Sequence, residues 1–292
     1  MLYRYFDPFV EYLKLVDFSD RSTGTISTRI NEFQGYLVST KTRSIKSVTY
    51  KHLVEFVADF KSPSAHITKS RVWMLRHFYH FLTLHQHVPK NIARDLPYPK
   101  IEKTVPQFLT SRELNRLIRH FSRRASDALG LRNLVIIMLL GFLGLRTATL
   151  IAVNIEDIDL SAGLLWVREK GRRERSLILP HSVCNIIAEY LRSIQLKKGP
   201  LLITRRKKRI SPRTLQDLFR NAADYEGIDK QLHARLFRHT AATHLNKIAG
   251  VDITQHVLGH ALRTNTYRYT HLNPDQYALY MKLHPYMRKE AP

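Results

Sequence analysis

The sequence predicts a mainly helical protein with a small antiparallel sheet, divided into an N-terminal helical bundle and a C-terminal domain of mixed α/β structure. Three observations predict this fold class. Apolar residues recur at helical spacing through residues 1–100, prolines cluster just before residue 107, and three short strand-like runs follow between residues 151 and 180. The chain has 292 residues, which is long enough for two domains of ordinary size.

The N-terminal domain, residues 1–100, is expected to be helical throughout, with a break at Lys61-Ser62-Pro63-Ser64. The segment from Ile67 to His87 places an apolar stripe beside a set of basic side chains. Arg71 and Arg76 in this set are candidates for contact with DNA phosphates. The alternative is a core helix with a solvated basic face, and both interpretations can hold for one helix.

A linker is predicted around residues 97–106, because prolines at this density stop helices and favour extended chain. Its composition is basic, and Lys103 is a candidate DNA contact. The second domain, residues 107–292 with a C-terminal tail, then begins with Thr110 and Glu113, which form a capping box at the start of a helix.

Between the linker and residue 180 the periodicity changes from that of helices to that of strands. Asp127 to Leu145 predicts a buried helix, and Arg146 follows it directly. The charged turn before the last strand contains Lys170 and Arg172. Strands are predicted for three segments, Ile155 to Leu160, Leu164 to Arg168 and Arg175 to Pro180.

The segment from Lys197 to Arg213 contains eight cations and no acid. Such a run favours contact with phosphates over a flexible solvated loop, and Arg206 and Lys207 are its candidate DNA contacts. The helix that follows is a candidate for insertion into the major groove of DNA. There, Arg213 and Gln216 would reach bases or phosphates.

The net charge of +23 indicates a polyanionic partner, because self-repulsion of this size opposes a compact fold. Nucleic acid is favoured over an anionic membrane, since the cations are spread along the whole chain and no lipidation motif stands out. A single cysteine excludes an internal disulfide framework. With no signal peptide and no apolar run of spanning length, we expect a cytoplasmic, nucleoid-associated protein that makes no membrane contact.

The stretch from Arg235 to His271 contains the residue types needed to cleave a DNA phosphodiester without a metal ion. That reaction requires a nucleophile, fixed positive charge on the non-bridging oxygens, and proton donors. Tyr269, Arg238 and His260 provide them. His260 ends a Leu-Gly-His tripeptide, and Tyr269 lies nine residues beyond it. Each residue alone is more often a packing residue, so the joint spacing is what indicates a site.

This spacing resembles the signature of the tyrosine recombinase (phage integrase) family, in particular its Xer-like and transposon-borne members. The signature is H-x-x-R, then L-G-H, then a tyrosine nine residues on, and Arg238, His260 and Tyr269 match it. One position departs, because Arg235 occupies the place of the first histidine. Either Arg235 adds a third guanidinium, or the histidine's role is lost or moves to His233, the nearest histidine upstream.

Two motifs nearer the N-terminus extend the resemblance. Gly144-Leu145-Arg146 matches the family's first arginine motif, G-L-R-x-x-E-L, although Thr149 replaces its glutamate. Lys170 matches the lysine of the family's K-G hairpin. The resemblance therefore implies that the N-terminal bundle is a core-binding domain and that the C-terminal domain is catalytic.

The resemblance also implies a mechanism. Tyr269 attacks the scissile phosphate and forms a 3′-phosphotyrosyl link, with release of a free 5′-hydroxyl. Arg146 and Arg238 hold the non-bridging oxygens. His260 donates a further hydrogen bond, and Lys170 protonates the leaving oxygen. Neither a metal ion nor any other cofactor is implied, and the sequence has no Walker-type motif and no carboxylate cluster at metal-binding spacing.

Double-stranded DNA is the partner implied, together with a homo-tetramer on paired DNA sites in which the C-terminal tail packs on a neighbouring protomer. A tail folded back on its own domain is the alternative. The favoured function is a site-specific recombinase that exchanges strands between two duplexes. Two alternative functions remain: a type IB topoisomerase-like enzyme without strand exchange, and a DNA-binding protein that has lost catalysis. Integration, transposition and dimer resolution remain open as biological roles.

Overall fold

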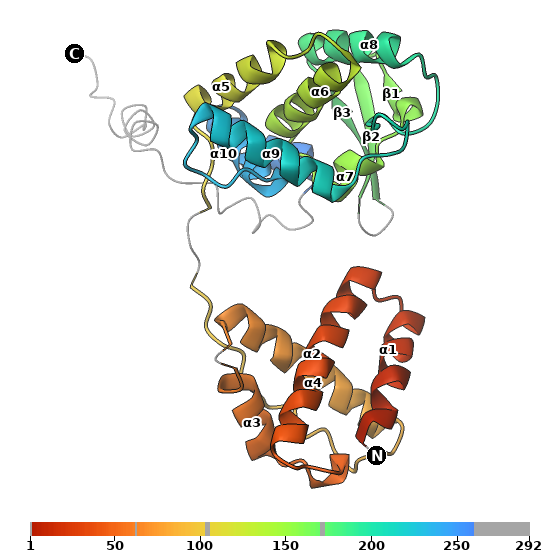
Figure 1. The fold of residues 1–292 in the computed structure, drawn as a ribbon, viewed down its shortest axis with the longest axis vertical. Helices are drawn as coiled ribbons and strands as arrows, with labels where there is room; N and C mark the ends of the chain where they lie inside the picture. Colours follow the sequence, from red (N-terminus) through yellow and green to blue (C-terminus); the bar gives the residue numbers. More distant parts are fainter. Residues whose placement is uncertain (1, 62, 103–105, 170–172, 260–292) are drawn as a thin grey trace, which may run out of the picture. The chain divides into compact units, whose positions relative to one another are not determined.

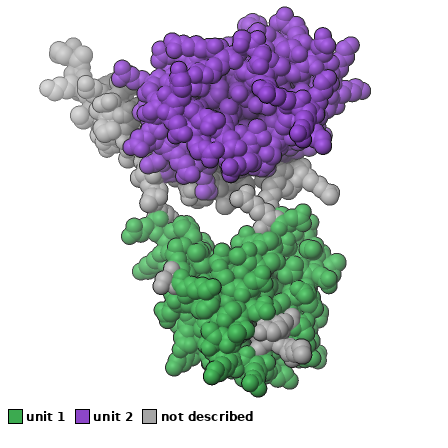
Figure 2. All heavy atoms as spheres, viewed as in Figure 1, with its two compact units in different colours: residues 1–104 green, residues 105–292 purple. Residues whose placement is uncertain are grey.

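The computed structural model describes residues 2–61, 63–102, 106–169 and 173–259. The chain divides into two compact units, residues 1–104 and 105–292 (Figure 2). The boundary lies within the proline-rich segment of residues 97–106. Within the described residues, no helix has both the length and the apolar character needed to cross a membrane.

Unit 1 is a bundle of helices whose apolar faces form one core (Figure 1). Aromatic rings meet inside it, with centroids 5.2 Å apart for Phe9 and Phe78 and 4.9 Å apart for Phe33 and Phe56. A Ser or Thr side chain caps the start of each of the last three α-helices, which satisfies backbone N–H groups left without a partner there. The helices are η1 (Leu2–Tyr5), α1 (Phe6–Leu15), α2 (Asp20–Ser39), η2 (Ile45–Ser47), α3 (Tyr50–Ala58) and α4 (Ala65–Leu84).

Arg71 belongs to the core of this bundle and not to its surface. Its side chain is 2% exposed, and its guanidinium lies 4.6 Å from the ring centroid of Phe56. Nε donates to Glu32 Oε2 at 3.0 Å, and Nη1 donates to the carbonyls of Phe56 and Phe60, both at 2.8 Å. These contacts offset the cost of burying a charge and join α2, α3 and α4 from inside. The expected contact of Arg71 with DNA is therefore wrong.

Arg76, one and a half turns further along α4, is half-buried. Its Nη2 donates to the carbonyl of Leu96 at 2.6 Å, and its guanidinium lies 4.6 Å from the ring centroid of Tyr98. Arg76 thus fastens the segment that leaves unit 1 onto α4. Its contact with DNA stays a prediction.

Unit 2 is built around α6, whose buried residues follow one another along almost the whole helix. Helices α5, α8 and α10 pack against α6 (Figure 1). Asp127 caps α6, because its carboxylate accepts from the Gly130 N–H at 2.7 Å, and Thr110 and Glu113 form the expected capping box on α5. The helices are α5 (Ser111–Ser122), α6 (Ala128–Leu143), α7 (Thr147–Ala152), η3 (Ile155–Asp157), α8 (His181–Ile194), α9 (Pro212–Glu226) and α10 (Ala234–Leu258).

The described part of unit 2 contains one antiparallel sheet in the order β1-β2-β3, formed by β1 (Ile158–Asp159), β2 (Leu164–Glu169) and β3 (Arg173–Ile178). Leu165 pairs with Leu177, and both side chains face the core. The mainly helical fold with a small antiparallel sheet is confirmed.

The first predicted strand, residues 155–160, is wrong in its first half. Residues 155–157 form the short helix η3, because the Asp157 carboxylate accepts from the Asn154 N–H at 2.8 Å and closes a turn there. Asp159 then accepts from the N–H groups of Ser161 and Ala162, both at 2.9 Å, which ends the strand after two residues.

Candidate active site

The corner between α6 and α7 brings Arg146 to the C-terminal end of α10. Gly144 ends α6 in the left-handed conformation, with φ 57°. A Cβ atom at this position would lie 2.7 Å from Leu258 Cδ2 and 3.1 Å from Ala241 Cβ. Glycine is therefore required twice, by the backbone conformation and by the close approach of α10.

Replacing Gly144 by alanine is expected to destabilise unit 2 by more than the about 1–2 kcal/mol that a left-handed alanine costs. Urea unfolding measures the loss. Gly227→Ala is the matched control, because Gly227 ends α9 with the same φ of 57° but has no atom within 4 Å of its Cβ position. Equal losses for the two variants would show that the approach of α10 to Gly144 contributes nothing.

Arg238 lies in the first turns of α10 and is 7% exposed. Helix α10 is kinked at Gly250, where φ is 77° and ψ is −177°, so its last turns return toward its first. Its Nη1 donates to the carbonyl of Gly144 at 2.9 Å, and its Nη2 donates to the carbonyl of Leu258 at 2.6 Å. One buried guanidinium thus joins the end of α6 to the end of α10. Its orientation is fixed from two sides, close to Arg146 at the start of α7.

Three arginines converge on the last carbonyl groups of α10. Carbonyls at a helix C-terminus have no partner within the helix and carry partial negative charge, so guanidinium groups are favourable there. The donors come from different parts of unit 2, namely the start of α7, the first half of α10 and β3. The bonds run from Arg238 Nη2 to Leu258 (2.6 Å), from Arg146 Nη2 to Gly259 (3.3 Å), and from Arg175 Nη1 to His256 (3.0 Å) and Val257.

The sequence predicts Arg175 only as the start of a strand, and Arg175 is not among the predicted site residues. Arg175 pairs with the buried Val167, and alternation places its side chain on the same face of β3 as Leu177. A charged residue on the core face of a strand needs a polar partner, which here is the end of α10. That alternation, Arg175 followed by Leu177 and Leu179, is the signal that could have identified it.

His233 is the N-cap of α10, not a free histidine. Its Nδ1 accepts from the Leu236 N–H at 2.9 Å, which places the ring proton of the neutral form on Nε2. Partial desolvation of the ring, together with the positive charge of Arg235, lowers the pKa of His233. Arg235 is exposed and has no hydrogen-bond or ion-pair partner among the described residues.

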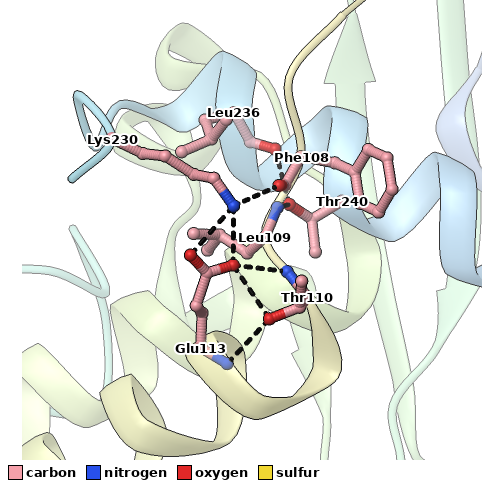
Figure 3. Close-up of polar contacts among 7 residues, drawn as sticks. All are labelled: Phe108, Leu109, Thr110, Glu113, Lys230, Leu236 and Thr240. Carbon is pink, nitrogen blue, oxygen red and sulfur yellow. Dashed lines mark hydrogen bonds and ion pairs between the residues drawn. The ribbon is translucent and has the colours of Figure 1, made fainter. Parts of the chain in front are cut away.

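The start of α10 is held by the segment that opens unit 2 (Figure 3). The Leu109 N–H donates to Thr240 Oγ1 at 2.8 Å, and that hydroxyl donates to the Leu236 carbonyl at 2.8 Å. Thr240 and Leu236 both lie on the first turns of α10, close to Arg238 in sequence. The contact therefore sets the position of the helix that carries the buried arginine.

Lys230 strengthens this attachment from the loop before α10. Its Nζ donates to the Phe108 carbonyl at 3.1 Å and to the two Glu113 carboxylate oxygens at 2.9 and 2.7 Å (Figure 3). Burial acts to raise the pKa of Glu113, but the hydrogen bonds from Lys230 and Thr110 outweigh it and lower the pKa. The carboxylate is therefore ionised at neutral pH and pairs with Lys230.

Two of the candidate DNA contacts line one hollow. Arg213 and Gln216, on α9, form part of a hollow of about 720 Å³ whose other wall is the loop that ends at His233. Asp217 accepts from Arg213 at 3.2 Å and from Arg220 at 2.7 Å, which orders these side chains on the surface. The hollow brings the expected base-contacting residues beside the N-cap of α10.

The basic run before α9 is ordered and contains exposed candidates. The Thr204 N–H donates to the Lys208 carbonyl at 2.7 Å, so residues 204–208 form a tight turn that carries Arg206 and Lys207 outward. Arg209 has a structural role, because its Nη1 donates to the carbonyls of Ile151 at 2.6 Å and Val153 at 3.2 Å. The start of α9 is thereby tied to the end of α7.

The remaining predicted site residues lie outside the described part of the chain. They are Lys103, Lys170, Arg172, His260 and Tyr269. Among the residues that the structure describes, no group of three or more His, Cys, Asp or Glu side chains is placed to hold a metal ion.

Comparisons with known proteins agree on one family. The family described as Phage integrase family matches residues 107–276. Tyrosine recombinase XerC of Oceanobacillus iheyensis is 29% identical over 296 residues, which covers 96% of each chain. Tyrosine recombinase XerC of Thermodesulfovibrio yellowstonii is 30% identical over 228 residues, which covers 74% of this chain and 75% of the relative.

A solved structure, XerH site-specific recombinase bound to a palindromic difH substrate in a post-cleavage complex, has a similar fold. The TM-score is 0.75 at 19% identity, over 89% of this chain and 79% of XerH. At this level of identity, the likeness bears on the fold alone.

Proposed function

Because this chain belongs to the phage integrase family and is a tyrosine recombinase, which cleaves and rejoins DNA in site-specific recombination, we propose that Arg146 and Arg238 hold the scissile phosphate while Tyr269 attacks it. The observation that carries this proposal is the convergence of Arg146 and Arg238 on Leu258 and Gly259, directly before His260. The two arginines thus donate to the residues that directly precede His260 in the sequence, and Tyr269 follows nine residues after that histidine.

The two guanidinium groups have complementary environments. Arg238 is buried and held by two carbonyls, so its charge is already oriented before DNA binds and does not reorganise during the reaction. Arg146 is exposed and can meet a phosphate that approaches from solvent. Together they stabilise the charge that develops on the non-bridging oxygens, and they favour the phenolate character that Tyr269 needs as a nucleophile.

The chemical step conserves a phosphoester bond. The phenol of Tyr269 loses its proton to solvent as its oxygen bonds to phosphorus, the 5′-oxygen leaves, and Lys170 gives that oxygen a proton. His260 donates a hydrogen bond to the phosphate. Since the 3′-phosphotyrosyl link retains the bond energy, the 5′-hydroxyl of a second duplex can attack it and complete strand exchange without ATP.

Double-stranded DNA is the substrate, and the cationic side chains of both units are its contacts. Arg213 and Gln216 of α9 enter the major groove, because they line the hollow beside His233. Phosphate contacts come from Arg76, Lys103, Arg172, Arg206 and Lys207. We expect the protein to be associated with the DNA of the nucleoid.

Exchange between two duplexes cuts four strands, and each cut uses one tyrosine. The active assembly is therefore a homo-tetramer on paired sites, held together by the C-terminal tails. A protomer without its neighbours would cleave and reseal a single strand, as a type IB topoisomerase-like enzyme does.

A nicked suicide duplex tests the proposed function, because loss of the short 5′-fragment prevents resealing and traps the covalent intermediate. The wild-type protein is expected to form an adduct and to join two substrate duplexes. Relaxation of supercoils without joined products would favour the topoisomerase-like alternative. Tight binding with no adduct would favour a DNA-binding protein that has lost catalysis.

A pair of variants distinguishes whether Arg235 or His233 takes the role of the family's first histidine. Arg235→Ala is expected to lower cleavage, because it removes an exposed guanidinium at the start of α10. His233→Ala removes the N-cap and is expected to cost about 1 kcal/mol of stability, with little effect on cleavage when the protein is folded. Single-turnover cleavage and urea unfolding of both variants are the measurements. Loss of cleavage in a stable His233→Ala variant, with Arg235→Ala active, would place the missing histidine at His233.

Arg175→Gln is expected to slow cleavage about tenfold or more, because two charge-assisted bonds to the end of α10 are lost. Affinity for uncleaved duplex is expected to change little. Arg168→Gln is the matched control, since Arg168 lies on the opposite, exposed face of the same sheet and forms an ion pair with Glu174. Equal effects on cleavage and on duplex affinity would argue against a positioning role for Arg175.

A further inference from the structure

Helix α5 carries a row of arginines that the proposed reaction does not use. Arg112, Arg116, Arg119 and Arg123 are spaced four, three and four residues apart, which places them on one face of the helix. The opposite face is buried in the core of unit 2. We call these four residues the arginine row. At a rise of about 1.5 Å per residue, the row is roughly 16 Å long.

The arginine row lines a hollow of about 420 Å³ in which every lining residue is ionisable. The hollow contains one acid, Glu226 at the end of α9. Its Oε1 accepts from His120 Nδ1 at 2.9 Å, and its Oε2 lies 3.5 Å from Arg116 Nε. The hydrogen bond from His120, with the charge of Arg116, lowers the pKa of Glu226. The surface therefore already binds one carboxylate.

The other arginines of the row are in excess over this single acid. Arg112, Arg119 and Arg123 are exposed and form no ion pair among the described residues. Like charges three and four residues apart destabilise a helix, so the row costs stability in the absence of an anionic partner.

The arginine row and the corner at Arg146 lie at opposite ends of α9. Arg209, just before α9, bonds to the end of α7, whereas Glu226, the last residue of α9, bonds to α5. Helix α9 has 15 residues and is about 22 Å long, and Figure 1 shows α5 and α7 at its two ends. The row is thus a separate surface from the cleavage site.

We propose that the arginine row is a docking surface for an acidic helical segment of a partner protein, with carboxylates spaced to match the four arginines. The seated Glu226 carboxylate shows the chemistry that the surface accepts. At its edge, Tyr225 is 68% exposed and the Arg124 guanidinium lies 4.3 Å from its ring centroid. Tyrosine and arginine are the residue types enriched at protein–protein hot spots.

The test uses the full chain and two labelled helical peptides of identical composition. In one peptide, four glutamates follow the four-three-four spacing, and in the other they are distributed around the helix. Fluorescence anisotropy measures both affinities. The striped peptide is expected to bind about tenfold more tightly, and the triple variant Arg112→Gln, Arg119→Gln, Arg123→Gln is expected to lose that advantage.

The matched control removes three exposed cations outside the predicted DNA-contacting segments, by Lys14→Gln, Lys41→Gln and Arg192→Gln. The control is expected to retain the preference for the striped peptide. Equal binding of the two peptides, or equal losses in the two triple variants, would show general charge attraction and overturn the proposal. Affinity for a 30-base-pair non-specific DNA duplex is measured for both triple variants. If the α5 variant alone loses as much affinity for this duplex as for the striped peptide, the arginine row is a DNA contact and the proposal is overturned.

Discussion

Replacing Arg238 by alanine is expected to lower the rate of DNA cleavage at least a hundredfold, which is the usual cost of removing one donor that stabilises charge in a transition state. Arg238 is buried, and its guanidinium is fixed by the carbonyls of Gly144 and Leu258. Water cannot replace such a preoriented charge at the same strength. Single-turnover cleavage of a nicked suicide duplex measures the effect.

The same variant is expected to lose stability, because two buried carbonyls lose their donor, at about 1–3 kcal/mol for each group left unsatisfied. Arg146→Ala separates the two effects. Arg146 is exposed, and its Nη2 donates to the Gly259 carbonyl at 3.3 Å. Its loss is expected to slow cleavage with little change in urea unfolding. An Arg238→Ala protein that folds and cleaves at the wild-type rate would contradict the proposed role.

Phenylalanine at position 269 is expected to abolish cleavage altogether, because no other group in the proposed mechanism forms the bond to phosphorus. Loss of one hydroxyl leaves the cationic surface intact, so affinity for the uncleaved duplex should be unchanged. Tyr267→Phe and Tyr277→Phe are the matched controls, since both are nearby tyrosines without the nine-residue spacing from His260. Retained cleavage in Tyr269→Phe, or complete loss in a control, would move the nucleophile elsewhere.

Much of the fold was predictable because local chemistry determines it. The buried helix ending at Arg146, the capping box of Thr110 and Glu113, and the strands after Gly163 follow from apolar period and turn residues. Arg146 and Arg238 are predicted site residues because their sequence motifs resemble those of the family. Their meeting at Leu258 and Gly259 did not, because it depends on how closely α6 and α10 approach at Gly144.

Two arginines show where sequence patterns are insufficient. Arg71 resembles a surface cation on an amphipathic helix, yet the carbonyls that bind it come from the end of α3 and the turn beyond it, which only the packed bundle brings together. Arg175 lies in β3, and its partners, His256 and Val257, are about 80 residues away in sequence. The local pattern can indicate that such an arginine needs a polar partner, but it does not identify a backbone acceptor that is distant in sequence.

The most direct test of Tyr269 as the nucleophile is to identify the amino acid that carries DNA in the adduct trapped on a nicked suicide duplex. Protease digestion followed by mass spectrometry locates the modified residue, and end-labelling of the DNA shows which end is attached. The proposed mechanism predicts a 3′-phosphate bonded to Tyr269 and a free 5′-hydroxyl on the released fragment. DNA attached to any other residue, or through a 5′-phosphate, would contradict it.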